Sequence, residues 1–93
     1  MDIKKAKQFV YIPVNRDNIF ISNNLQKLLE MSKSSEYFCS TCGVKTVYAL
    51  IDTDHGETLM HLSKQSEKYV ISERYLLWKY IPKIYSNRKI VNL

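Results

Sequence analysis

Cys39 and Cys42 are the only two cysteines of this 93-residue chain, and Gly43 follows the second of them directly. Two thiols three positions apart direct their sulfurs toward one point, and a glycine after them can adopt the positive φ that closes such a turn. A metal knuckle, a redox pair and a pair of reduced thiols packed as small hydrophobes are the alternatives. The redox pair is disfavoured, because that chemistry needs a cysteine at a helix N-terminus and a predicted strand follows here.

The length of the chain fits one small domain, residues 1–93, and leaves no room for a second core. Hydrophobic residues make up 45% of it, with only two glycines and two prolines, which argues against disorder. The charged start, Met1 to Lys5, lacks the apolar stretch of a signal peptide, and no apolar run reaches the roughly 20 residues of a membrane span. We therefore expect a cytoplasmic protein that does not bind membranes, with cysteines that are reduced or metal-bound.

Two β-hairpins are predicted in the first two thirds of the chain. Residues 9–21 are rich in β-branched and aromatic side chains around a polar turn, and Pro13 marks an edge or a bulge. Residues 44–51 alternate strictly in a second strand, and 58–62 return antiparallel after a polar turn at 52–57.

Helical spacing appears twice. Leucines at three- and four-residue intervals over 25–31 follow polar capping residues and predict a helix of about ten residues between the hairpins. A second helical pattern runs over 66–81 and stops at Pro82. The residues that carry this second pattern are Tyr69, Val70, Glu73, Leu76, Leu77 and Tyr80. Residues 89–93 are expected to form an edge strand or a docked tail.

The sequence contains four features in a fixed order: an aromatic residue, the Cys-x-x-Cys-Gly motif, a hairpin of about twenty residues, and His61. Over residues 8–67 this order resembles the zinc-ribbon segment at the start of competence protein CoiA-like proteins. It is also similar to short zinc-ribbon proteins of bacterial mobile elements. The resemblance implies a zinc-ribbon-like fold and a chain encoded by a phage or a plasmid.

Zinc is the cofactor that this resemblance implies, with Cys39, Cys42 and His61 as ligands. Lys64 stands where the family carries its second histidine, and a lysine ammonium does not ligate zinc. The fourth ligand is then His55, Glu67 or water. His55 falls in the predicted hairpin turn, where a solvated side chain is the alternative interpretation.

The expected fold class is α+β. It is a small zinc-ribbon-like antiparallel sheet of two β-hairpins, with a short helix between them and a longer C-terminal helix. Residues 8–67 form the zinc-ribbon-like β/α core of the single domain, and residues 68–93 form a basic, aromatic C-terminal helix and tail.

The charge is unevenly distributed along the chain. Residues 36–63 carry one basic and four acidic side chains, whereas residues 64–93 carry seven basic and two acidic ones. Cations and aromatic rings interleave in the second segment, a combination that suits phosphates and bases of single-stranded nucleic acid. A solvated basic helix and docking on an acidic protein surface are the alternatives. The residues concerned are Arg74, Trp78, Lys79, Lys83, Tyr85, Arg88 and Lys89.

No enzyme is expected, because the sequence has no glycine-rich phosphate loop, no nucleophile elbow and no hydrolytic metal motif. The sequence favours a small binding protein that inhibits a host defence protein or nucleoprotein complex, of the anti-CRISPR or anti-restriction type. The alternative is a zinc-ribbon module that contacts DNA or RNA through its basic C-terminal face. A homodimer with a tyrosine-rich interface is a further alternative.

Overall fold

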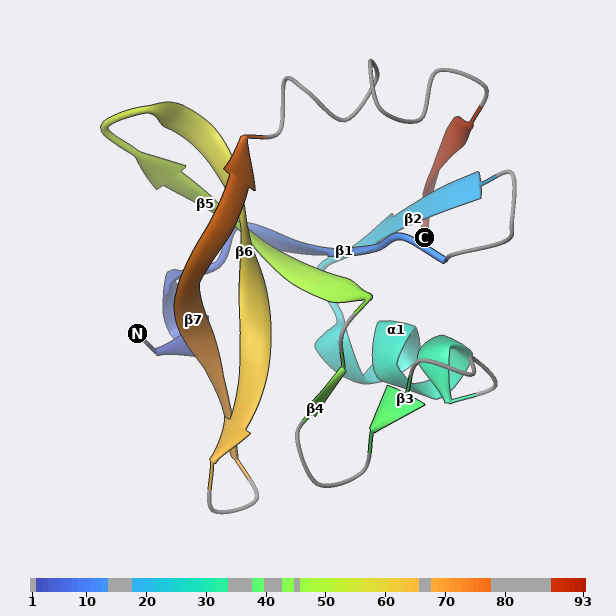
Figure 1. Ribbon diagram of the computed structural model, residues 1–93. Coiled ribbons are helices and arrows are strands. Elements are labelled where there is room, and N and C mark those ends of the chain that lie inside the picture. Colours follow the sequence, from blue (N-terminus) through green and yellow to red (C-terminus); the bar gives the residue numbers. More distant parts are fainter. Residues whose placement is uncertain are drawn as a thin grey trace.

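The structure is a computed structural model, shown in Figure 1, and it describes residues 2–13, 18–33, 38–39, 43–44, 46–65, 68–77 and 88–93. Its elements in chain order are the 3₁₀ helix η1 (Ile3–Lys5), β1 (Gln8–Tyr11), β2 (Asn18–Ser22), α1 (Leu25–Ser32), β3 (Phe38–Cys39), β4 (Gly43–Val44), β5 (Val47–Thr53), β6 (Gly56–Gln65), β7 (Lys68–Leu77) and β8 (Lys89–Asn92).

Six of the described strands form one mixed sheet in the order β7-β6-β5-β1-β2-β8. Neighbours are antiparallel except β2 and β8, which run parallel. The two predicted hairpins, β1–β2 and β5–β6, are both present, and β1 joins them by pairing with β5. The strands β3 and β4 pair separately as a small ribbon.

The short predicted helix is confirmed as α1. Its first turn is capped by Asn24, whose Oδ1 accepts a hydrogen bond from the Lys27 N–H at 3.4 Å. Leu28 and Leu29 are buried, and the buried Ser32 hydroxyl donates to the Leu29 carbonyl at 2.8 Å. The leucine stripe therefore packs α1 on the sheet, against β1, β2 and β5. Within the described residues, no helix is long and apolar enough to cross a membrane.

Each face of the sheet carries its own cluster of buried residues. The cluster on the side of α1, here called the helix-side core, contains Phe9, Tyr11, Leu28, Leu29, Val47, Ala49, Ile51, Met60, Leu62 and Ile71. The cluster on the other face, the far-side core, contains Val10, Ile12, Ile19, Ile21, Leu50 and Leu59, with Tyr48 packed against it. Adjacent residues of β5 fall in different clusters, so the predicted alternation of that strand is confirmed.

The predicted longer C-terminal helix is wrong. Residues 68–77 form the strand β7, which pairs antiparallel with β6 at residues 68–71 and 75–77, on either side of a register shift between Met60 and Leu62. The helical interpretation counted the charged Glu73 within its apolar stripe, whereas Tyr69, Val70 and Ile71 are residue types that favour strands. Residues 78–87, which held the rest of that predicted helix, lie outside the described residues.

The α+β class with a small antiparallel ribbon sheet is therefore corrected to a mostly β fold, a mixed six-stranded sheet with one short α-helix in the described residues. The physical reason for the strand β7 lies in its neighbour β6, which spans ten residues and offers a long row of backbone N–H and C=O groups for pairing. Pairing with this row outweighs the weak helical propensity of residues 68–77, because strand pairing satisfies their backbone and buries Ile71.

Candidate functional site

The cysteine motif begins in a two-residue strand ladder. Cys39 on β3 is the register partner of Gly43 on β4, and the next pair is Phe38 with Val44. A chain reversal thus closes between Cys39 and Gly43, as the motif predicts, while Cys42 itself lies outside the described residues. The strand β4 packs beside β6, the strand that carries His61.

His61 lies half-buried in β6, and its ring contacts Tyr48 of β5. The two ring centroids are 4.8 Å apart and the planes are tilted by 58°. Because Met60 and Leu62 on either side of it belong to the helix-side core, His61 projects from the far side of the sheet. The imidazole therefore has an aromatic neighbour that the sequence did not reveal.

His55 lies at the exposed tip of the β5–β6 hairpin, as predicted. Its N–H donates to the Thr53 hydroxyl at 3.1 Å, and Gly56 beside it has a φ of 93° that favours glycine. His61 is six positions further along the chain, which corresponds to about 20 Å of strand. The hairpin thus does not bring the two histidines together.

Across the side chains that the structure describes, no three His, Cys, Asp or Glu residues converge on a point that could hold a metal ion. The side chains of Cys39, Cys42 and Glu67, three of the predicted or alternative ligands, are not among those described.

The predicted basic face is placed only in part. Arg74 lies in β7, and Trp78, Lys79, Lys83 and Tyr85 lie outside the described residues. The guanidinium of Arg88 donates to the Pro13 carbonyl and so ties the start of β8 to the end of β1. Lys89 begins β8 and is exposed.

The two edges of the sheet differ in their covering. At the β7 edge, the N-terminal segment adds an antiparallel bridge between Asp2 and Val70, and η1 packs against β7. At the β8 edge, no described residue pairs with the outer side of the strand. Figure 1 shows β8 at the margin of the sheet beside β2, remote from η1.

Apolar side chains are exposed at this β8 edge. Ile90 is 46% exposed and Leu93 is 44% exposed, and they are the exposed large hydrophobic residues among the described side chains. The alternatives for residues 89–93 were an edge strand and a docked tail, and the edge strand is confirmed. Its parallel pairing with β2 had no sequence signal, because nothing local links the two segments.

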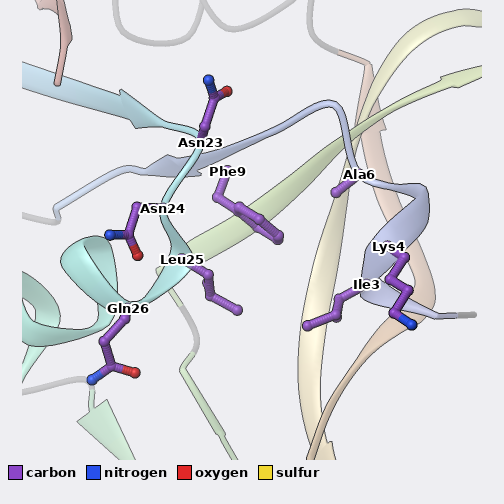
Figure 2. Close-up of a pocket in the computed structure, with 8 residues that line it drawn as sticks. All are labelled: Ile3, Lys4, Ala6, Phe9, Asn23, Asn24, Leu25 and Gln26. Carbon is purple, nitrogen blue, oxygen red and sulfur yellow. The ribbon is translucent and has the colours of Figure 1, made fainter.

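A groove of about 580 Å³ lies between η1 and the start of α1, where Ile3, Phe9 and Leu25 point toward one another from three elements (Figure 2). Its complete lining is Ile3, Lys4, Ala6, Phe9, Asn23, Asn24, Leu25 and Gln26. An apolar floor with amides and one lysine at the rim suits the binding of an apolar group. The lining includes no carboxylate, imidazole or thiol that would supply acid–base or nucleophilic chemistry.

Ion pairs lie on the surface, away from β8. The Lys7 ammonium is 3.3 Å from Asp52 and 3.5 Å from Glu57, and the hydrogen bond to Asp52 raises the pKa of Lys7. On α1, the hydrogen bond from Lys33 to Glu30 lowers the pKa of that carboxyl. The sequence did not single out either pair.

No protein-family model, no curated protein and no solved structure matches the chain.

Proposed function

We propose that this chain is a non-enzymatic binding protein that docks on another protein or nucleoprotein complex through its β8 edge. One observation supports this proposal. Ile90 and Leu93 are both about half exposed, and they lie at a strand edge that no described residue covers. Natural proteins usually cover, charge or interrupt such an edge, since it pairs readily with other chains. An edge that exposes Ile90 and Leu93 beside the single charge of Lys89 therefore suits the binding of a selected partner.

The charge of this region supports docking on an acidic surface. The strands β1, β2 and β8 together contain one charged residue, Lys89, and Arg88 precedes it. Protein-binding patches usually combine apolar side chains with a polar rim, and the exposed Ile90 and Lys89 supply one of each kind. Inhibition of a host defence complex by a phage- or plasmid-encoded protein is the role that we propose for this docking, on the resemblance to zinc-ribbon proteins of mobile elements.

The docking proposal is tested by affinity capture with the tagged chain from a bacterial host lysate, with mass spectrometry of the recovered proteins. We expect one stoichiometric partner, which the double variant Lys89→Glu/Ile90→Asp no longer captures. Lys27→Glu is the control for the lysine part of this variant, because it makes the same two-unit charge change as Lys89→Glu at an exposed position on α1. Failure of the wild-type chain to recover any stoichiometric partner would refute the docking function.

Contact with DNA or RNA through the basic C-terminal face is the second candidate, supported by the exposed Lys89 and by the excess of cations in residues 64–93. Phosphate contacts make affinity fall steeply with salt. A gel-shift titration at about 50 mM salt distinguishes the two functions, because a docking protein shows no shift there while a nucleic-acid module binds and is released as salt rises.

Zinc at Cys39, Cys42 and His61 is proposed as a structural element that fixes the β3–β4 ribbon beside β6. The ladder between Cys39 and Gly43 and the packing of β4 on β6 support it. Metal analysis of the purified chain should give about one zinc per chain, which Cys39→Ser removes. A zinc content near zero in chelator-free buffer contradicts this proposal and leaves the docking function unaffected.

A further inference from the structure

We infer that the β8 edge binds an extended, acidic segment of the partner, which joins the sheet as a strand alongside β8. This inference rests on the proposed docking function and specifies what occupies the docking edge. Strand addition of this kind draws affinity from main-chain hydrogen bonds and specificity from alternate side chains. Both can be assigned to individual residues of β8.

The backbone of β8 offers its free groups at two residues. The Leu93 N–H donates to the Ile21 carbonyl at 2.8 Å, so Leu93 directs its backbone groups toward β2. Strand alternation then directs the groups of Val91 toward β2 as well, and those of Ile90 and Asn92 away from it. Among the described residues, Ile90 and Asn92 have no backbone partner on that outer side. An added strand would therefore bond to these two residues.

The side chains of β8 differ between its two faces. Ile90 is the register partner of Ile19, so it continues the far-side core to the edge of the sheet, where it is left 46% exposed. Lys89 and Val91 lie on the helix side, beside Asn18 and Phe20. A partner strand with apolar residues on the far side and acidic residues on the helix side would complement both faces.

Charge favours an acidic partner over a second copy of this chain. Neither β2 nor residues 88–93 contain a carboxylate side chain, whereas Arg88 and Lys89 are cationic. Two copies paired antiparallel through β8, with the twofold axis at Val91 so that the outward groups of Ile90 meet those of Asn92, would place each Lys89 opposite a Leu93. The lysine would then gain no opposite charge from the partner strand. An acidic segment provides that charge.

The test uses the full chain and two ten-residue peptides, one alternating valine with glutamate and the other alternating valine with lysine. We expect the glutamate peptide to shift the amide resonances of Ile90 and Asn92, and the lysine peptide to bind about threefold to tenfold more weakly. Asn92→Pro removes one outward N–H and keeps the inward bonds, so the glutamate peptide should bind it about tenfold more weakly or worse.

The matched control is Val91→Pro, which removes an N–H that points toward β2 and should disturb the β2–β8 resonances even without peptide. Equal binding of the glutamate peptide by wild type and Asn92→Pro, or a preference for the lysine peptide, overturns the inference. So does a concentration-dependent dimer that Asn92→Pro abolishes, since the occupant is then a second copy. A partner captured equally by wild type and Asn92→Pro also refutes the strand addition but leaves the docking function standing.

Discussion

The two edge strands of the sheet, β7 and β8, differ in how their outer backbone groups are covered. At β7 the chain uses its own N-terminal segment, which bridges Val70 through Asp2 and lays η1 beside the strand. At β8 the outer backbone groups of Ile90 and Asn92 have no partner in the described residues, and two half-exposed hydrophobic side chains lie along the strand. The N-terminal segment thus covers the β7 edge near Val70, whereas no described residue pairs with the outer side of β8.

Electrostatics separates the two halves of the sheet as well. The half near β7 contains the surface pairs of Lys7 with Asp52 and Glu57, whereas β1, β2 and β8 contain one charged residue in all. Lys89, with Arg88 before it, therefore gives the described part of this half a positive charge. A field of this kind selects partners by sign rather than adding much affinity.

The largest expected effect compares register partners on β2 and β8. Ile19→Ala should lower the free energy of unfolding by about 2–5 kcal/mol, because Ile19 is 1% exposed in the far-side core. Ile90→Ala, its neighbour across the β2–β8 pair, should cost about 0.5 kcal/mol or less because that side chain is half exposed. Urea denaturation measures both. Equal costs would mean that β8 is as buried as the interior of the sheet.

Proline substitution should distinguish the inward and outward sides of β8 in the unbound protein. Val91→Pro should lower the free energy of unfolding by about 1–3 kcal/mol, because it removes a ladder hydrogen bond to β2. Asn92→Pro should change it by about 0.5 kcal/mol or less, because its N–H points away from β2. Thermal denaturation checks the order of the two variants, and the reverse order would contradict the assignment of the outer side.

Loosening the N-terminal cover of β7 near Val70 should have a moderate effect. The Asp2 carboxylate accepts a hydrogen bond from the Lys4 N–H at 2.9 Å and so caps η1. Asp2→Ala should cost about 0.5–1 kcal/mol and speed hydrogen exchange at the Val70 amide, while exchange at Val91 stays unchanged. Exchange that rises at both edges would show that they are coupled rather than separately covered.

The smallest effect concerns pH and should be confined to the half near β7. The pKa of Lys7 is raised in the folded chain by its hydrogen bond to Asp52, so its ammonium favours folding at pH values below the unfolded pKa. This contribution is lost as the pH rises through the folded pKa. The pair is exposed and the effect is small. Titration followed by NMR should shift resonances of β5 and β6 but not of β8, and Lys7→Met should remove the shift.

Local patterns were sufficient to predict much of the fold. The first hairpin, α1 and the β5–β6 hairpin each carry their signals within a few residues, such as the capping Asn24 before the leucines of α1. The alternating residues of β5 predicted which side chains lie on each face of the sheet, and the two clusters confirm it. Strict alternation is a reliable signal because it indicates a strand.

The features that the sequence did not reveal are those that depend on distant partners. β7 was predicted as a helix because its apolar residues also fit a helical spacing, and only the presence of β6 decides between the two periods. The site shows the same limit. Lys89 was identified by its charge, but the open edge that makes Ile90 and Leu93 exposed arises from the order of strands in the sheet.

The parallel pairing of β2 and β8 also has a consequence for the order of folding. Asn18 and Lys89 are register partners 71 positions apart, whereas Tyr11 and Phe20 of the first hairpin are only nine apart. Closing the longer loop costs more conformational entropy and slows the contact. Because β2 cannot gain this neighbour until residues 88–93 have been synthesised, we expect β8 to be the last of the described strands to join the sheet.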